Sequence, residues 1–319
     1  REGIQGGPMR VFLTGSSGYI GQRVVKLFSE DPEITEIIGL DINEPPNEYP
    51  GFRHVSGDVT QPFDELLEGV DIAVHLAFIV DPMRDEKLQE RINLGGTANF
   101  LDAVRKHRVP DVVVFTSATA YGAHPDNPEF MKESDPLRGN CSYPYSRDKL
   151  RQEALVNGLR ESGMRVKTLR PVVVFGPTVG NFISRYLLKP IVITAIGGAT
   201  HFQLVHEDDV ARAVVHLSRH KGEGAYNLSA DGLMETALAA RKAGRPMMRL
   251  PRWILYVMVW IGWKLGLKFL TETPTGLLNY LIYPWQVDNR RLKEEAGFVY
   301  TYDAEETYDD FLRGQNLSK

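Results

Sequence analysis

Short apolar runs alternate with amphipathic stretches along the first 175 residues. Strands are predicted at the apolar runs Arg10–Thr14, Glu36–Leu40, His54–Gly57, Ile72–Leu76, Val112–Thr116 and Arg165–Val174. Helical spacing is found between them, at Tyr19–Phe28, Asp85–His107 and Tyr145–Glu161. Continuous apolar strands are typical of a parallel sheet that helices cover on both faces. The pattern predicts an α/β fold in which the six strands form one Rossmann-type, doubly wound parallel sheet.

The pattern changes after Gly176-Pro177. Residues 178–205 hold no clean repeat, and beyond them we predict a helix at Asp208–His220, a strand at Ala225–Leu228 and an aromatic-rich helical stretch over 233–280. We expect residues 9–175 to form the sheet domain, with 205–230 contributing to it. Residues 176–204 and 231–319 are then expected to form a smaller C-terminal lobe that binds the substrate. Residues 1–8 precede Met9 and are expected to be a remnant of an expression vector.

Composition narrows the classes of function. The formal net charge is −4, so the chain lacks the excess of basic residues that binds phosphate backbones, and nucleic acid is not expected as a partner. Cys141 is the single cysteine, which excludes an intrachain disulfide and a multi-cysteine zinc site. We expect a cytoplasmic protein with a small-molecule substrate and no metal site.

The segment Thr14–Gly21 (TGSSGYIG) follows the first strand and opens the first helix. Glycine at 15, 18 and 21 permits a sharp turn, close approach of the backbone to a pyrophosphate, and tight helix–strand packing. The helix N-terminus can then hold phosphate charge. This spacing predicts that residues 9–175 bind a dinucleotide through a turn made of Gly15, Ser17, Gly18, Tyr19, Ile20 and Gly21.

Two acidic residues follow neighbouring strands. Asp41 ends the second strand 26 residues after Gly15, where a carboxylate can accept from both adenosine ribose hydroxyls. A 2′-phosphate would meet like charge there, which favours NAD over NADP. Asp58 can accept from the adenine amino group. The alternative for Asp41 is a helix or turn cap, and for Asp58 an Asx-turn in its loop.

Tyr145 and Lys149 lie four residues apart and therefore share one face of a helix. A phenol is a poor base at neutral pH, and a neighbouring ammonium favours its ionised form. Ser117 follows the fifth strand, at the sheet edge where ligands bind, and its hydroxyl can donate to a substrate oxygen while Tyr145 exchanges the proton. The alternative role for Ser117 is a helix or turn cap.

Together these motifs resemble the extended short-chain dehydrogenase/reductases, most closely the NAD-dependent epimerase/dehydratase group and its UDP-glucose 4-epimerase-like members. The resemblance covers nearly all of residues 9–315. It is carried by the glycine turn and by further segments in the family's order: His75-Leu76-Ala77, Asn93–Thr97, Ser117–Gly122, Tyr145/Lys149, Arg170-Pro171, Gly176-Pro177 and Val205–Val210.

The resemblance implies a catalytic set made of Ser117, Tyr145 and Lys149, with Asn93 ordering the active-site helix. It further implies that NAD is contacted by these three catalytic residues, by the turn, and by Asp41, Asp58, Val59, Leu76, Ala77, Phe78, Pro171 and Val172. Helices 85–107 and 145–161 make a homodimer interface in this family, which implies a dimer here.

The substrate side departs from the family pattern. Val173 and Phe202 stand where nucleotide-sugar enzymes carry an asparagine and an arginine for the diphosphate. Arg185 or Lys189 could replace those contacts, and Phe78 and Thr119 are further expected substrate contacts. A nucleotide sugar and an apolar sterol-like or 3-oxoacyl substrate both remain open, as do epimerisation and net dehydrogenation. A non-catalytic NAD-binding regulator is the alternative outside enzymes.

The run Trp253–Trp263 holds eleven residues without a charge, followed by Lys264 and Lys268. As a helix it covers about half of a ~30 Å hydrocarbon core, so it does not cross a bilayer. Three interpretations are open: a packed helix of the lobe, a wall of an apolar substrate cavity, or peripheral membrane contact through residues 253–269.

Overall fold

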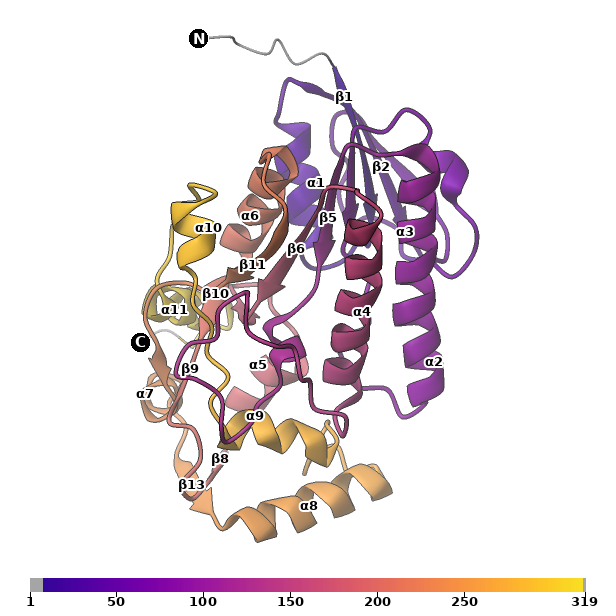
Figure 1. The fold of residues 1–319 in the computed structure, drawn as a ribbon. Coiled ribbons are helices and arrows are strands. Elements are labelled where there is room, and N and C mark those ends of the chain that lie inside the picture. The colour runs from indigo at the N-terminus through magenta and orange to yellow at the C-terminus, as the bar shows by residue number, and fades with distance from the viewer. Residues whose placement is uncertain (1–7, 318–319) are drawn as a thin grey trace.

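The computed structural model describes residues 8–317, so most of the predicted N-terminal remnant lies outside the described residues. Its centre is a sheet of seven parallel strands (Figure 1). In spatial order these are β11 (Gly224–Leu228), β6 (Val166–Pro171), β5 (Asp111–Phe115), β4 (Ile72–His75), β1 (Met9–Thr14), β2 (Ile34–Asp41) and β3 (Phe52–Ser56). The Rossmann-type fold is therefore confirmed.

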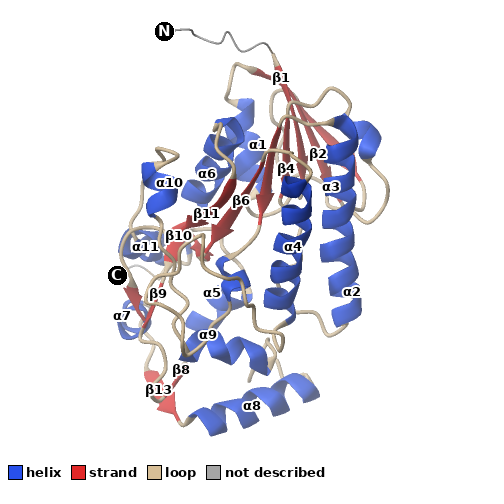
Figure 2. Ribbon diagram, in the orientation of Figure 1, coloured by secondary structure: helices blue, strands red, loops and turns tan. Residues whose placement is uncertain are grey.

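Helices cover both faces of the sheet (Figure 2). The helices are α1 (Gly21–Ser29) and α6 (Glu207–Arg219) on one face, with α3 (Gly96–His107) and α4 (Pro144–Glu161) on the other. Side chains alternate between the two faces of the sheet along β1. Val11 and Leu13 therefore pack in the core beneath α1 and α6, and Phe12 packs in the core beneath α3 and α4. This two-sided burial is why the strands are continuously apolar.

The strand order reverses between β1 and β4. From β1 the sheet continues to β2 and β3 on one side, and from β4 it continues to β5, β6 and β11 on the other. In open α/β sheets, ligands bind beyond the carboxyl ends of the strands at such a switch point. The glycine turn follows β1 and the segment Leu76-Ala77-Phe78 follows β4, so both lie at this point.

Two predictions about the sheet need correction. The sheet has seven strands instead of six, because β11 pairs with β6 at its edge. The predicted strand Arg165–Val174 is two strands, since the chain leaves the sheet after Pro171. Beyond Val172, β7 (Val173–Phe175) pairs instead with β10 (Leu204–His206).

The predicted helix Asp85–His107 is also divided. Asp85 caps α2 (Glu86–Glu90) by accepting a hydrogen bond from the Leu88 amide at 2.9 Å. A π-helical turn, Arg91–Gly95, then joins α2 to α3. Such turns are frequent at functional sites because they turn side chains away from the regular helical register.

The remaining elements lie mainly beyond the carboxyl ends of the strands (Figure 1). Two more small sheets pair β8 (Val192–Ala195) with β13 (Met247–Leu250) and β9 (His201–Phe202) with β12 (Met234–Glu235). The helices are α5 (Phe182–Leu187), α7 (Thr236–Lys242), α8 (Arg252–Leu265), α9 (Leu278–Ile282), α10 (Arg290–Glu294) and α11 (Ala304–Gly314). Single helical turns occur at Asp64–Leu67, Ala118–Tyr121 and Thr275–Leu277.

The prediction of a helical stretch over 233–280 was only partly right. Pro246 and Pro251 bracket β13, and proline interrupts a helix because it lacks an N–H donor and clashes with the preceding turn. Gly266, with φ of +74°, then ends α8 in the left-handed conformation. The division of the chain into an NAD-binding and a substrate-binding domain stays a prediction.

Candidate active site

The glycine turn packs closely against the chain that follows β4. Gly15 has φ of +75°, and a Cβ on it would lie 2.7 Å from the amide nitrogen of Ala77. A Cβ on Gly21 would overlap the Gly15 carbonyl oxygen. Both positions therefore require glycine, and the turn has no room for side chains where a phosphate group would approach.

The turn also offers unused polar groups. The hydroxyl oxygens of Ser16 and Ser17 are buried and have no hydrogen-bond partner among residues 8–317. Helix α1 begins directly after the turn, and no side chain caps its N-terminus. Uncapped N–H groups at a helix N-terminus suit an anionic group. The residues present thus fit the pyrophosphate of a dinucleotide.

Asp41 and Asp58 lie on the wall of the same cavity. The Asp41 carboxylate accepts from the backbone amides of Ser17 (3.0 Å) and Asn43 (2.9 Å), which fixes its place beside the turn. Asp58 accepts from the Thr60 amide at 2.8 Å, so the alternative Asx-turn is formed as well. Each carboxylate keeps free lone pairs for a ligand hydroxyl or amino group.

One cavity of about 1090 Å³ joins the turn to the elements beyond the sheet. At its far end the wall is mainly apolar and comes from α5, α8, α9 and the adjoining loops. These residues include Phe182, Ile183, Tyr186, Leu187, Ile191, Ile193, Leu255, Met258, Val259, Phe269, Leu270, Leu278, Leu281 and Trp285. The cavity is therefore polar and lined by glycines at one end and mainly apolar at the other.

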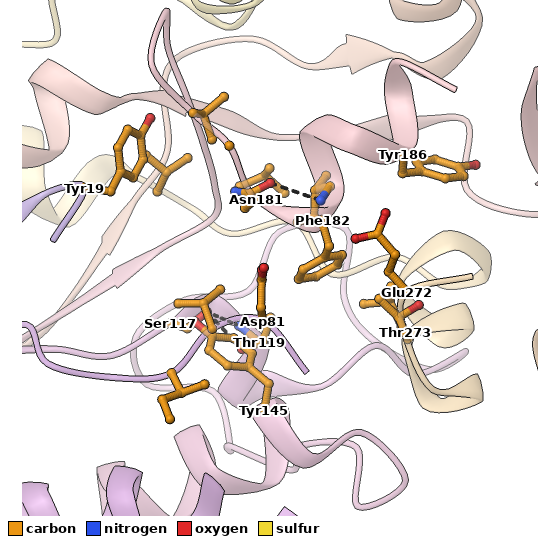
Figure 3. A pocket seen from close by; sticks show the side chains of 18 of the residues that line it. Tyr19, Asp81, Ser117, Thr119, Tyr145, Asn181, Phe182, Tyr186, Glu272 and Thr273 are labelled. Carbon is orange, nitrogen blue, oxygen red and sulfur yellow. Dashed lines mark hydrogen bonds between the residues drawn. The ribbon is translucent and has the colours of Figure 1, made fainter. Parts of the chain in front are cut away.

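Ser117 and Tyr145 lie together at the junction of these two ends (Figure 3). The Ser117 hydroxyl oxygen accepts from the amide (3.1 Å) and the hydroxyl (2.9 Å) of Thr119. Ser117 therefore does cap a turn, and its own hydroxyl hydrogen is left to donate to Tyr145 or to a ligand oxygen. Phe182 faces this pair from α5 across the pocket, whereas the Asn181 side chain turns back and caps α5 (Figure 3).

Burial raises the pKa of the Tyr145 phenol to about 12, and a hydrogen bond with Ser117 acts in the opposite direction. Tyr145 is in the first turn of α4, which begins at Pro144, and proline is well tolerated at that position. The phenol is thus held at the cavity wall in its protonated form.

Lys149 is buried one turn further along α4, and its contacts differ from the expectation. Its Nζ donates to the carbonyl of Phe115 and to Gln152 Oε1, both at 3.0 Å, and lies 3.5 Å from the centroid of the Phe78 ring. The centroid of the Tyr145 ring is 5.7 Å away.

The expected lowering of the Tyr145 pKa by Lys149 is therefore not found in this arrangement. Burial instead lowers the pKa of Lys149 well below its ordinary value, against the attraction of Glu153 and Asp148. The Lys149 ammonium lies against the face of the Phe78 ring. Phe78 itself packs edge-on against Tyr145, with 5.7 Å between the ring centroids.

A buried chain of hydrogen bonds links Lys149 to the end of β1. Gln152 donates to Thr97 Oγ1 (3.3 Å), which also contacts His75 Nε2 (3.0 Å), and His75 Nδ1 contacts Thr14 Oγ1 (2.7 Å). The Thr97 hydroxyl donates to the carbonyl of Asn93, so His75 donates to it from Nε2. In the neutral imidazole, Nδ1 then accepts from the Thr14 hydroxyl.

Burial lowers the pKa of His75 to about 3, with the charge of Lys149 acting in the same direction. The neutral imidazole is therefore the form present at physiological pH. Through this chain of hydrogen bonds, the end of β1 and the face of α4 that carries Lys149 are fixed relative to each other.

Asn93 lies in the π-helical turn and is buried behind the cavity wall. Its side chain accepts from the Ile79 amide (2.8 Å) and donates to Asp148 (3.3 Å), the residue before Lys149. Asn93 thus joins the loop after β4 to α4, and its role in ordering the active-site helix stays a prediction.

A buried ion pair anchors α4 from the other side. Arg170 on β6 donates through Nε (2.8 Å) and Nη2 (3.0 Å) to the two carboxylate oxygens of Glu153. Thr116 donates to the same carboxylate at 2.7 Å. Burial would raise the pKa of Glu153, but the bonds from Arg170 prevail and hold it below its ordinary value.

The expected site residues meet in one cavity with three exceptions. Those on its wall are Gly15, Gly18, Tyr19, Ile20, Gly21, Asp41, Asp58, Val59, Leu76, Ala77, Phe78, Ser117, Thr119, Tyr145, Lys149, Pro171, Val172, Val173 and Phe202. Ser17 and Asn93 lie behind the wall. Arg185, expected as a substrate contact, also lies off it, because its guanidinium pairs with Glu272 (2.8 Å) and Asp81 (3.1 Å).

The structure adds residues that the sequence did not single out. Asp81, Glu272, Tyr143 and Tyr280 all line the cavity. The Tyr280 hydroxyl donates toward the carbonyl of Thr119 (2.9 Å) and Ser146 Oγ (2.8 Å), which ties α9 to the catalytic loop. Tyr280 lies in an apolar run, and nothing in its sequence context distinguishes it from a core residue.

Comparison with known proteins finds likeness along the whole chain. The model of the NAD dependent epimerase/dehydratase family matches residues 11–229. An uncharacterized protein of Mycobacterium tuberculosis is 27% identical over 98% of this chain and 85% of its own length. An Escherichia coli protein named N-acetyl-alpha-D-glucosaminyl-diphospho-ditrans,octacis-undecaprenol 4-epimerase is 28% identical over 60% of this chain and 58% of its own.

Among solved structures, DesIV of Streptomyces venezuelae is similar in fold. It is described as a dTDP-glucose 4,6-dehydratase with NAD and TYD bound. The TM-score is 0.75 at 21% identity, with 97% of each chain covered.

Proposed function

Because the chain belongs to the NAD-dependent epimerase/dehydratase family, we propose that it oxidises or reduces a secondary alcohol or ketone carbon with Tyr145 as the acid/base. Members of this family are NAD-dependent enzymes of the extended short-chain dehydrogenase/reductase type, and NAD is the cofactor. The observation that carries the proposal is that Ser117 and Tyr145 lie where the glycine-lined end of the cavity meets its apolar end.

The chemistry follows from the groups at this junction. When bound at the glycine turn and Asp41, NAD would supply the group that exchanges a hydride with the carbinol or carbonyl carbon. In reduction the protonated Tyr145 gives its proton to the substrate oxygen, and in oxidation Tyr145 must first lose its proton so that the phenolate takes the proton of the carbinol oxygen. The Ser117 hydroxyl donates to that oxygen. The buried Lys149, held by Phe115 and Gln152, supports the position of Tyr145 on α4.

We infer that the substrate carries a large apolar body, as a sterol-like or 3-oxoacyl compound does. The far wall is mainly apolar, and the Arg185 guanidinium beside it is balanced by Asp81 and Glu272. Lys189 is the cation on the wall itself, and it donates to the carbonyls of Phe269 and Leu270 at 3.4 Å. A diphosphate held beside two carboxylates would be costly without further charged donors.

A nucleotide or diphosphate-linked sugar is the second candidate. It is supported by the names of DesIV and of the Escherichia coli relative, because the latter is named as the 4-epimerase of a sugar that is linked through a diphosphate to undecaprenol. Either substrate would place a carbinol carbon beside Tyr145. The two differ in what fills the far end of the cavity.

The test of the acid/base role compares two neighbouring phenols. Tyr145→Phe is expected to lower turnover by about 10²–10⁴-fold while NAD still binds, because it removes only the proton-exchanging hydroxyl. Tyr143→Phe is the matched control, since Tyr143 also lines the cavity, 5.9 Å from Tyr145 between ring centroids. It is expected to keep turnover within a few-fold of the parent.

Turnover is followed by NADH absorbance, or by product analysis where no net redox change occurs, and NAD affinity by calorimetry. Equal turnover in Tyr145→Phe and the parent would contradict the proposal and favour a non-catalytic NAD-binding regulator.

A further inference from the structure

Helix α8 crosses the lower end of the molecule in Figure 1, beyond the carboxyl ends of the strands and below α9. Its inner face is buried through Leu255, Val259 and Gly262. Its outer face presents large apolar side chains to solvent. Trp253 is 69% exposed, Trp260 55% and Leu265 66%, and Phe269, just after the helix, is 75% exposed.

The exposed residues follow helical spacing. Trp253, Val257, Trp260, Ile261 and Leu265 recur at intervals of three and four, so they form one stripe along α8. Scattered apolar residues on a surface need no explanation, but a contiguous aromatic stripe indicates an interaction site.

The charge along the segment that carries this stripe has one sign. Residues 236–271 contain seven lysines and arginines and no aspartate or glutamate, in a chain with a net charge of −4. Arg249, Arg252, Lys264 and Lys268 have no carboxylate within 4.0 Å in the described part of the chain. Lys264 lies 4.8 Å from the Trp260 ring centroid, so cation and aromatic face share the same surface.

The same helix forms part of the substrate cavity. Leu255, Met258 and Val259 line it from the inner side of α8, and Phe269 and Leu270 continue the wall. Arg84, in the loop after β4, donates to the carbonyl of Trp263 at 3.1 Å and so connects α8 to the chain beside the catalytic residues. One helix thus separates the outer apolar stripe from the cavity.

We propose that the outer face of α8, with Phe269, docks on a bilayer that carries anionic headgroups. Tryptophan and phenylalanine enter the interface between headgroups and acyl chains, while lysine and arginine contact the headgroups. Within residues 8–317, no helix has both the length and the apolar character needed to cross a membrane. With 14 residues, α8 is about 21 Å long and lies in the plane of the interface.

Charge favours a bilayer over a second copy of the chain as the occupant. A twofold dimer through α8 would bring the stripe, and with it the unpaired cations, of both copies together. An anionic surface instead compensates those cations, and it places the cavity wall next to the lipid phase. Docking by itself is independent of the proposed function, because it requires no turnover.

The test is co-sedimentation of the full chain with vesicles of phosphatidylcholine alone or mixed with phosphatidylglycerol. We expect binding to the mixed vesicles that weakens with salt. Trp260→Glu is expected to lower it about tenfold or more, and so is Lys264→Glu/Lys268→Glu, because each lysine near an anionic surface contributes substantially to binding. Val299→Glu, at an apolar position that is 72% exposed elsewhere, is the matched control and is expected to bind like the parent.

A thermal shift with NAD checks that each variant is folded. Vesicle binding that is equal in parent, Trp260→Glu and the double lysine variant would overturn the proposal. So would a parent that binds no vesicles but is a dimer that Trp260→Glu converts to a monomer. Loss of catalysis in Tyr145→Phe with vesicle binding retained would concern the proposed function and leave docking intact.

Discussion

At the residue scale, the site depends on buried polar groups that each have a defined protonation state. His75 is neutral because burial disfavours the imidazolium, and its hydrogen bonds with Thr97 and Thr14 fit the neutral ring. Tyr145 keeps its proton for the same physical reason, although it is partly accessible from the cavity.

His75 should make stability depend on pH. Its pKa falls from 6.5 to about 3 on folding, so between these values the unfolded chain binds more protons than the folded one. The stabilisation is present above pH 6.5 and is lost as the pH falls. From pH 7 to 5.5 we expect the parent to lose roughly 1 kcal/mol more unfolding free energy than His75→Asn, as measured by denaturant titration. Parallel pH profiles would contradict a buried neutral His75.

The sequence predicted Ser117, Tyr145 and Lys149 as candidate catalytic residues but not their contacts. The three are found from spacing and motif order, because they follow strand and helix positions that the hydrophobic pattern fixes. The pairing of Arg185 with Asp81 and Glu272 joins residues about 90 to 100 positions apart, which no local pattern signals. The same holds for the position of Lys149 beneath Phe78.

At the scale of elements, the glycine turn is held by backbone contacts that leave no space for a methyl group at Gly21. Its fit to the segment after β4 places the N-terminus of α1 at the switch point of the sheet. Gly95, in the π-helical turn, is different, because a Cβ there would have no atom within 4 Å.

These two glycines form a matched pair of variants. Gly21→Ala is expected to weaken NAD binding about tenfold or more, since the added methyl pushes the turn open where the pyrophosphate lies. Gly95→Ala is expected to leave NAD affinity unchanged and to raise stability by about 0.5–1 kcal/mol, because its φ of −65° suits alanine. Calorimetry with NAD and denaturant titration measure the two effects. Unchanged NAD affinity in Gly21→Ala would contradict the assigned turn.

Element prediction succeeded where one periodicity governed a segment. The strands of the first half and helices α4 and α6 were predicted within a few residues, because each buries a regular apolar set. The segment 233–280 was less predictable. There Pro246 and Pro251 around β13 and the left-handed Gly266 interrupt a segment whose other residues favour a helix.

At the scale of the whole molecule, sheet and lobe elements share one cavity with two characters. The cofactor end is built by the strand order of the sheet, and sequence motifs reveal it. The substrate end is built by α5, α8 and α9, which assemble from distant parts of the chain. The apolar wall and the pairing of Arg185 beside it are found only in the structure, although Val173 and Phe202 already favoured an apolar substrate in the sequence.

The measurement that tests the central claim most directly is a thermal-shift titration of the NAD-bound protein. It compares a sterol, a 3-hydroxyacyl compound and a UDP-hexose. An apolar ligand is expected to raise the unfolding midpoint by several degrees beyond NAD alone, because saturation adds about 2.7 kcal/mol at a hundredfold excess over Kd. A shift with the UDP-hexose, together with none from either apolar compound, would contradict an apolar substrate.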